Sequence, residues 1–149
     1  MHFTVLAEFY PNAQSERIAI FNTLSIYYAN LAMEEVKLKK KIGHRPHLTK
    51  KILKTNAENQ SQLFEKAVNC LNEADKISYT EPMTWVGKAQ INLMRRKTAK
   101  IPGEAADLEK KALSNYDNAL QANPDNVPAL IGKVRKCDSF LGTIFCSCL

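Results

Sequence analysis

Glycine and proline are scarce in this chain, with 5 Gly and 6 Pro among 149 residues. An all-β sandwich or barrel needs a turn about every ten residues, and so few turn formers argue against one. No uninterrupted apolar stretch approaches the roughly 20 residues of a membrane span, so we expect no membrane partner. Most apolar residues recur at three- and four-residue spacing, which predicts amphipathic helices and an all-α fold.

Cysteines are also few, and their placement does not suggest a disulfide framework. Three of the four lie in the last 13 residues (Cys137, Cys146 and Cys148), and Cys70 lies within a helical pattern. A reducing intracellular compartment fits this usage better than an oxidising one. The first ten residues contain Glu8 and no basic n-region, so we expect no secretory signal.

Patterns that carry chemistry are missing as well. Cys146 and Cys148 are separated by one residue, which is not the spacing of a zinc site, and no histidine lies nearby. His44 and His47 are read as residues of a solvated loop. The chain has neither a Gly-rich phosphate loop nor a G-x-S-x-G motif, and its acids lie on helix faces. We therefore expect no enzyme, no catalytic residue, no metal and no cofactor.

The net charge of +6 comes from one segment. Between Lys37 and Lys54 stand eight basic residues and no acid, and the rest of the chain carries a charge of −2. Such a run is more often a solvated linker, but it is also compatible with a nucleic-acid or phosphate-binding patch. The candidates for a basic patch are Lys39, Lys40, Lys41, Lys50 and Lys51.

Apolar periodicity predicts five helices. Residues 43 to 57 are polar and basic and are read as a loop, and Pro102-Gly103 marks a second loop over 97 to 103. We divide the chain into an N-terminal extension over 1–14, a helical region over 15–136 and an atypical tail over 137–149. The helical region carries a basic insertion over 35–57 and a loop insertion over 97–107. The predicted helices are 16–41, 59–77, 83–96, 104–121 and one from about 127 that fades beyond 136.

A repeat becomes visible when the sequence is shifted by 45 residues. Small residues then align with small ones and large with large, as expected for helices that pack in pairs. A helix with alanines seven residues apart allows a neighbour to approach closely, and the bulky residue between them fills the adjacent groove. We expect Trp85 to be buried against the Ala67–Ala74 helix. The aligned pairs are Ala67 with Ala112, Leu71 with Tyr116, Ala74 with Ala119, Trp85 with Leu130, Gly87 with Gly132 and Lys88 with Lys133.

This spacing resembles the tetratricopeptide motif, whose period is about 34 residues, with the excess placed in loops. Phe21, Leu24, Ser25 and Tyr28 fall at the large, Leu, small and Tyr positions of the motif's opening helix. The resemblance implies a truncated tetratricopeptide-type solenoid of helix pairs, in which a longer loop does not disturb packing because each repeat touches only its neighbours.

Three segments make the resemblance more specific: 15–22 followed by Tyr27-Tyr28, 74–77 with 81–88, and 123–133. In this order they resemble the N-terminal repeats of the large tetratricopeptide subunit of the polymerase-associated factor complex, over about residues 15–133. That resemblance implies a nuclear scaffold without catalytic activity. It also implies binding to other subunits of the complex, indirect association with RNA polymerase II, and roles in transcription elongation and co-transcriptional histone modification.

The chain departs from that family in two respects. Family members are many times longer, so we expect this chain to be a fragment. The match stops at Val134, and the tail that follows is apolar, which predicts an aggregation-prone C-terminus. Two other hypotheses therefore stay open: a basic module that contacts nucleic acid or histones through residues 37–54, and a truncated product without function.

A solenoid of helix pairs offers a concave groove, which the first helix of each pair is expected to line. The polar residues of those helices are the candidates for contacting a partner segment. They are Asn22, Asn30, Lys88 and Asn92.

Overall fold

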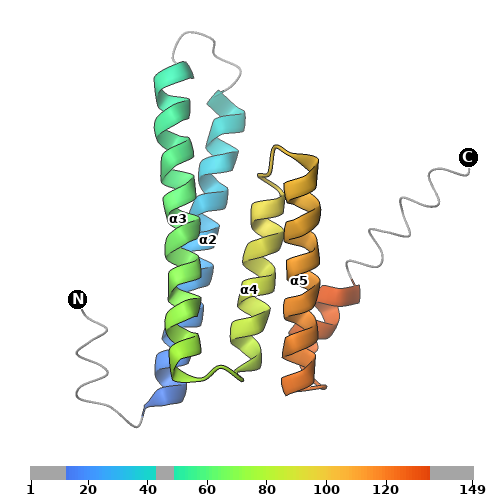
Figure 1. The fold of residues 1–149 in the computed structure, drawn as a ribbon. Coiled ribbons are helices and arrows are strands. Elements are labelled where there is room, and N and C mark those ends of the chain that lie inside the picture. The colour runs from blue at the N-terminus through green and yellow to red at the C-terminus, as the bar shows by residue number, and fades with distance from the viewer. Residues whose placement is uncertain (1–12, 43–48, 135–149) are drawn as a thin grey trace, which may run out of the picture.

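The computed structural model describes the backbone of residues 13–42 and 49–134, and the side chains of residues 13–37 and 59–134. Within these ranges the chain is helical and contains no strand (Figure 1). The predicted tail, its three cysteines, His44, His47 and most of the N-terminal extension lie outside the described residues. The helices are α2 (Gln14–Ile42), α3 (Thr49–Ile77), α4 (Pro82–Arg96), α5 (Pro102–Ala122) and a last one over residues 127–134.

Local sequence explains where these helices start. Both α4 and α5 begin with a proline directly after an extended residue, Glu81 or Ile101. Proline is suited to this position because its fixed φ matches the helix and its missing N–H would have no helical partner there. The helix over 127–134 is capped by Asn126, whose Oδ1 accepts a hydrogen bond from the Ala129 amide at 3.0 Å. Such a cap satisfies one of the free donors of the first turn.

The predicted boundaries hold within two residues for α2, α4 and α5, but the start of α3 was predicted wrongly. The helix begins at Thr49, ten residues before the expected start, so residues 49–57 are helical and not part of a loop. These residues have no apolar periodicity, but Lys and Leu favour helix and the segment continues α3 without a breaker. The loop predicted over 97–103 likewise ends at Ile101, because α5 starts at Pro102.

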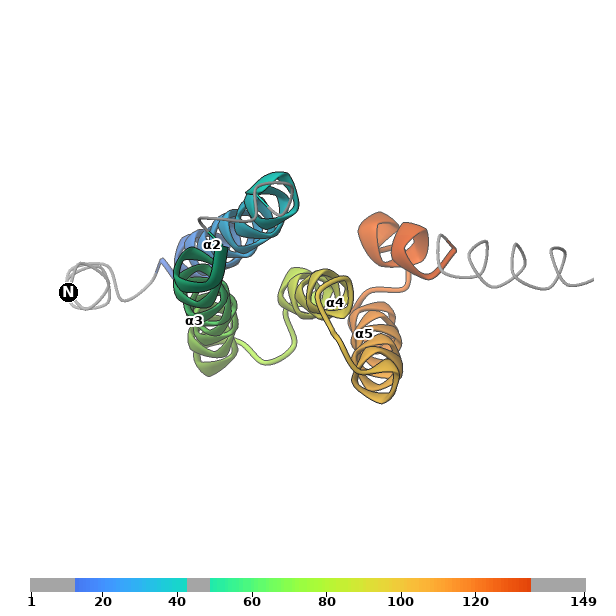
Figure 2. The same cartoon turned by 90° about the horizontal axis from the view of Figure 1, so that it is seen from above.

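The helices pack as two antiparallel pairs, α2 with α3 and α4 with α5 (Figure 1). Packing within each pair is far more extensive than packing between the pairs, which runs through contacts of α4 with both α2 and α3. In the view from above, α2 and α3 lie on one side of α4, and α5 and the helix over 127–134 lie on the other (Figure 2). This arrangement confirms the predicted all-α, tetratricopeptide-like solenoid of helix pairs.

Two core clusters correspond to the two helix pairs. The aligned alanines are fully buried in both units of the 45-residue repeat, and the bulky residues between them, Leu71 and Tyr116, are buried as well. The first cluster consists of Ala29, Ala32, Phe64, Ala67, Leu71 and Ile91. The second consists of Trp85, Val86, Ala89, Ala112, Tyr116, Ala119 and Ala129.

The two aligned glycines stand where helices approach closely. A methyl group at Gly87 would lie 3.1 Å from Leu71 Cδ2, and one at Gly132 would lie 2.3 Å from the Tyr116 ring. Each glycine therefore faces the bulky residue of the preceding helix. The contact between Gly87 and Leu71 in one repeat unit is therefore equivalent to the contact between Gly132 and Tyr116 in the next.

The packing predicted for Trp85 needs correction, and its repeat partner Leu130 differs from it. Trp85 is buried as expected, but it belongs to the cluster with Ala112, Tyr116 and Ala119 rather than to the Ala67 cluster. It touches the end of the preceding pair through Tyr79, with the ring centroids 5.1 Å apart and the indole N–H donating to the Tyr79 carbonyl at 3.0 Å. Leu130, its partner in the repeat, is 43% exposed, because no described helix covers that side of residues 127–134.

Candidate partner-binding groove

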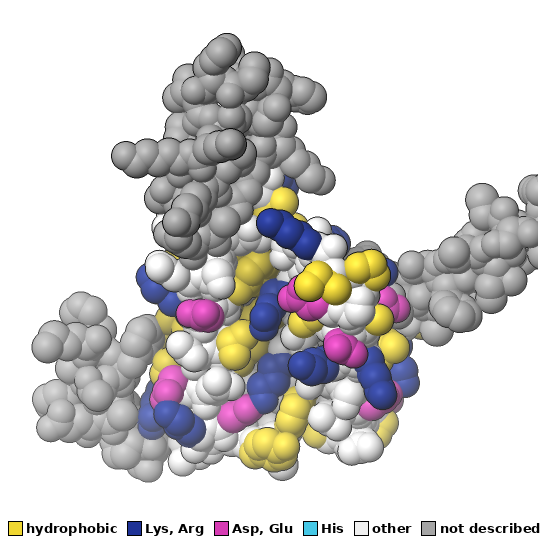
Figure 3. All heavy atoms as spheres, turned by 45° about the horizontal axis from the view of Figure 1, so that its top comes forward, with side chains coloured by type: hydrophobic (Ala, Val, Ile, Leu, Met, Phe, Trp, Pro, Cys, Tyr) yellow, Lys and Arg dark blue, Asp and Glu magenta, His cyan; other side chains and the backbone are white. Residues whose placement is uncertain are grey.

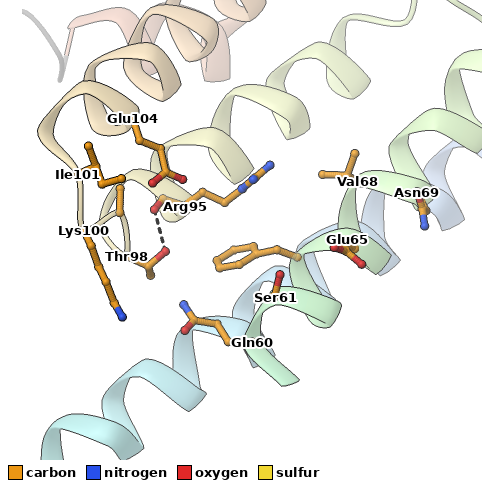
Figure 4. Close-up of a pocket in the computed structure, with 12 residues that line it drawn as sticks. Gln60, Ser61, Glu65, Val68, Asn69, Arg95, Thr98, Lys100, Ile101 and Glu104 are labelled. Atoms are coloured by element: carbon orange, nitrogen blue, oxygen red, sulfur yellow. Dashed lines mark hydrogen bonds between the residues drawn. The ribbon is translucent and has the colours of Figure 1, made fainter. Parts of the chain in front are cut away.

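A cavity of about 590 Å³ lies between α3 and the start of α5. One wall is α3, and the opposite wall is the end of α4 together with the loop that leads to α5 (Figure 4). The volume lies within the range of small-ligand pockets, which is roughly 300–1,000 Å³. The lining residues are Gln60, Ser61, Phe64, Glu65, Val68, Asn69, Arg95, Thr98, Ala99, Lys100, Ile101 and Glu104.

A smaller cavity of about 200 Å³ adjoins the first, and both are lined by Val68 and Arg95. The two form one depression, which we call the α3–α5 groove. It is hollowed between the helix pairs, with hydrophobic side chains beside lysines and arginines (Figure 3). The smaller cavity is lined by Val68, Leu71, Asn72, Lys88, Ile91, Asn92, Arg95 and Asn115.

The floor of the groove is apolar. Phe64, Leu71 and Ile91 belong to the first core cluster and are nearly inaccessible, so only their edges face the groove. Ile101 is different, because 65% of its surface is exposed at the rim of the larger cavity. The groove therefore offers a closed apolar base with one exposed aliphatic side chain at the edge.

Arg95 extends from α4 toward α3, on the side where Val68 and Ser61 lie (Figure 4). Its guanidinium makes no ion pair within the described part of the chain. The neighbouring cations differ in this respect, since Lys88 pairs with Asp75 and Arg96 Nε lies 3.0 Å from Glu109 Oε2. Arg95 is therefore a charge that the described fold leaves unneutralised.

Four asparagines line the same groove: Asn69, Asn72, Asn92 and Asn115. None of their side chains makes a hydrogen bond to another described residue. A primary amide both donates and accepts, as a peptide backbone does. Side chains from three helices thus present free amide groups around an apolar floor.

The structure separates the four residues predicted to contact a partner. Lys88 and Asn92 line the smaller cavity. Asn22 lies between α2 and α4, where its Oδ1 accepts a hydrogen bond from the Thr84 hydroxyl at 3.2 Å, and Asn30 is exposed on α2. Neither asparagine of α2 lines the two cavities, because these lie on the side of the second helices, α3 and α5. Their role in binding stays a prediction.

Lys88 is held in place more firmly than a free surface lysine. Its ammonium pairs with Asp75 and lies 4.2 Å from the centroid of the Trp85 ring. The second carboxylate oxygen of Asp75 is buried and has no hydrogen-bond partner among the described residues. Lys88 therefore connects α3 with α4, and the Asp75 carboxylate neutralises its charge in the absence of a partner.

The backbone at Lys39, Lys40 and Lys41 belongs to the end of α2, and that at Lys50 and Lys51 to the start of α3. Their side chains lie outside the described part of the chain. Among the described residues there is no cluster of three or more potential metal ligands, and no helix is long and apolar enough to cross a membrane. Burial and nearby Glu73 raise the pKa of the Cys70 thiol.

Sequence reasoning missed Arg95, Asn115 and Ile101 as groove residues. Arg95 belongs to a basic run that reads as solvent-facing charge, and Ile101 precedes a Pro-Gly pair that reads as a loop. One signal was available: Val68, Asn72, Asn92 and Arg95 recur at helical spacing on two consecutive helices. That signal identifies one face of each helix but does not show that the two faces meet.

Comparison with known proteins gives one informative match. Over 126 residues, which are 85% of its length, the chain is 35% identical to "Protein CTR9 homolog" of Arabidopsis thaliana. The aligned part is 9% of that protein, so the chain spans a small portion of the relative's length. No family model matches the chain, and no solved structure matches it. The match confirms the resemblance to the large tetratricopeptide subunit that the three segments predicted.

Proposed function

We propose that this chain is a non-catalytic scaffold that binds segments of other proteins. The observation that carries the proposal is the 35% identity to the CTR9 homolog across a region that folds into stacked helix pairs. Stacked helix pairs bury their apolar faces against neighbours and leave extended surfaces between repeats, which suits them to hold a partner. The α3–α5 groove is one such surface, with an apolar floor and polar side chains around it.

The finer proposal concerns the assembly in which the scaffold works. The relative supports a place in the nucleus, within a polymerase-associated factor complex that accompanies RNA polymerase II. The partners are then other subunits of that complex, and contact with the polymerase is indirect. Through them the scaffold takes part in transcription elongation and co-transcriptional histone modification.

Binding to purified subunits tests this function. The chain is immobilised and incubated with each recombinant subunit of the polymerase-associated factor complex from the same organism. We expect it to retain at least one subunit, while the unfolding variant Leu71→Asp retains none, because a carboxylate cannot replace a side chain that is 1% exposed. Retention of every subunit at the level of bare resin would contradict the proposal.

One observation favours a second candidate function. Residues 37–42 belong to the end of α2 and residues 49–54 to the start of α3, so both lysine groups stand at the same end of one helix pair (Figure 1). A helical pair concentrates charge more than a flexible linker does. We therefore keep nucleic-acid or histone contact through residues 37–54 as the alternative, although we favour the protein scaffold.

A further inference from the structure

We propose that the α3–α5 groove binds a peptide segment in which an Asp or Glu side chain stands close to a large apolar side chain, with Arg95 receiving the carboxylate. This inference rests on the proposed scaffold function and specifies the chemistry of the segment it binds. It follows from the charges, the apolar floor and the free amides of the groove, in that order.

The charged residues of the groove are distributed unequally between its two cavities. The smaller cavity is lined by Lys88 and Arg95 and by no acid. Both acids of the groove, Glu65 and Glu104, line the larger cavity, and neither lies within ion-pair distance of Arg95. In the larger cavity these two acids offset the charges of Lys100 and Arg95, whereas no acid lines the smaller cavity. A carboxylate on a bound peptide is therefore attracted more strongly toward the smaller cavity, where Arg95 is the cation without an ion-pair partner in the described chain.

Arg95 is the group that can bind this carboxylate. Lys88 is already neutralised by Asp75, whereas the Arg95 guanidinium has no acidic partner in the described chain. A guanidinium presents two parallel N–H donors to a carboxylate and forms stronger hydrogen bonds than neutral pairs do. Its position in the lining of both cavities places it at the middle of the groove.

The larger cavity suits the apolar side chain of the peptide. Its base contains Phe64 and Val68, and Ile101 stands exposed at its rim. An aliphatic or aromatic side chain placed there would cover Ile101 and remove apolar surface from water. The acidic and apolar side chains of the partner must therefore be close in sequence, because the two cavities adjoin at Val68 and Arg95.

The side-chain amides of the four asparagines can form hydrogen bonds with the backbone of the bound peptide. Asn69 and Asn72 stand on α3, opposite Asn92 of α4 and Asn115 of α5, and none of the four side-chain amides is hydrogen-bonded to another described residue. From Gln60 to Asn72 the groove follows α3 for about 18 Å at the rise of an α-helix. That length accommodates roughly five or six residues of extended peptide.

A titration with synthetic peptides tests the proposal. The purified ¹⁵N-labelled chain is titrated with a ten-residue Ser/Ala peptide that carries one central Leu-Asp pair, and with peptides that carry Leu-Asn, Leu-Lys or Ser-Asp instead. We expect Leu-Asp to bind most tightly and to shift amides of α3, α4 and the 97–101 loop. Equal or tighter binding of the Leu-Lys peptide overturns the proposal, as does a site elsewhere on the chain.

Charge reversal identifies the residue. Arg95→Glu should weaken binding of the Leu-Asp peptide about tenfold or more, the loss expected when a charged hydrogen bond becomes a repulsion. Lys110→Glu is the matched control, since Lys110 is exposed on α5 and lines neither cavity. Arg95→Gln, which keeps the size and removes only the charge, should give an intermediate loss. Unchanged affinity in Arg95→Glu overturns the proposal, as does a 12-nucleotide RNA that displaces the peptide in an Arg95-dependent way.

The same variant separates this inference from the proposed function. If the wild-type chain retains a complex subunit and Arg95→Glu retains it equally well, the groove is wrong and the scaffold function stands. If the wild-type chain retains no subunit, the scaffold function fails whatever the peptides show. Loss of subunit retention in Arg95→Glu but not in Lys110→Glu supports both.

Discussion

At the scale of single residues, the two aligned glycines allow a matched test of the packing. Gly87 faces a flexible leucine end at 3.1 Å, so Gly87→Ala should change the free energy of unfolding by no more than about 1 kcal/mol, since the gain in helix propensity offsets a slight crowding. Gly132 faces the rigid Tyr116 ring at 2.3 Å, so Gly132→Ala should destabilise by about 1–3 kcal/mol. Urea unfolding followed by circular dichroism measures both values.

A double mutant provides the control for this prediction. The equivalent of Tyr116 in the first repeat is Leu71, which can move away from an added methyl group. Tyr116→Leu combined with Gly132→Ala should therefore cost less than the sum of the two single changes, as expected for residues in contact. Strict additivity would show that the glycine does not contact the ring.

Trp85 offers a second test at this scale. Truncation of Trp85 to alanine should lower the free energy of unfolding by about 3–5 kcal/mol, because a buried indole with a hydrogen bond to Tyr79 and a lysine over its ring is lost. Chemical denaturation measures the loss. Tyr79→Ala serves as comparison, since that side chain is 66% exposed and should cost much less. A Trp85→Ala cost under about 1 kcal/mol would refute the packing described for the second cluster.

The residue types predicted well which side chains are buried, but they predicted poorly which helices these side chains pack against. The alanines at 67, 74, 112 and 119 are buried as their spacing indicated, because small residues at heptad distance have few other roles on a helix. The partner of Trp85 could not be predicted from the repeat. Alignment of equivalent positions shows which residues share an environment, but the helix that supplies this environment depends on how one pair packs on the next.

At the scale of whole elements, the longer α3 shows the limit of apolar periodicity as a signal. Thr49 to Ala57 form helix although they carry no recurrent apolar stripe, so their helical state follows from propensity and from continuity with the rest of α3. By contrast, the prolines at 82 and 102 determine helix starts through their own geometry, and there the prediction held within two residues.

The lysines at the end of α2 and the start of α3 allow a test that distinguishes the two candidate functions. Replacing Lys39, Lys40, Lys41, Lys50 and Lys51 with glutamine keeps helix propensity and removes five charges. If the protein scaffold is right, subunit retention is unchanged by these substitutions and depends weakly on salt. Nucleic-acid binding through this patch would instead fall steeply between 50 and 200 mM salt and disappear in the variant, because released counterions drive it. Filter binding of a short RNA duplex measures the second outcome.

At the scale of the whole molecule, the helix over 127–134 exposes an apolar face in this chain. Its exposed side chains are Val127, Leu130, Ile131 and Val134, while Ala129 on the opposite face is fully buried. Changing Val127 and Val134 to glutamine should leave stability within about 0.5 kcal/mol per site and reduce self-association at tens of micromolar. Sedimentation velocity measures the association. Ala129→Gln is the control and should destabilise the fold, since it places an amide in a closed core.

The groove belongs to this scale too, and the sequence alone could not have located it. Its walls come from two helix pairs, so its existence depends on the angle and offset at which α4 packs against α3. The sequence specified Lys88 and Asn92 as polar residues of a first helix, but not the side of the solenoid to which they contribute. Arg95 differs from Lys88 and Arg96 because those two form ion pairs with acids of the fold, and only the structure shows these pairs.

The uneven packing of the helix pairs has a mechanical consequence. Each pair is joined along its length, whereas the two pairs meet through the narrower contacts of α4 with α2 and α3. Under tension along the solenoid, we expect the joint between the pairs to bend before either described pair deforms, because fewer contacts hold it. The groove spans that joint. A peptide bound across it would contact both helix pairs and limit the bending between them, so the stiffness of the solenoid would depend on how much of the groove is occupied.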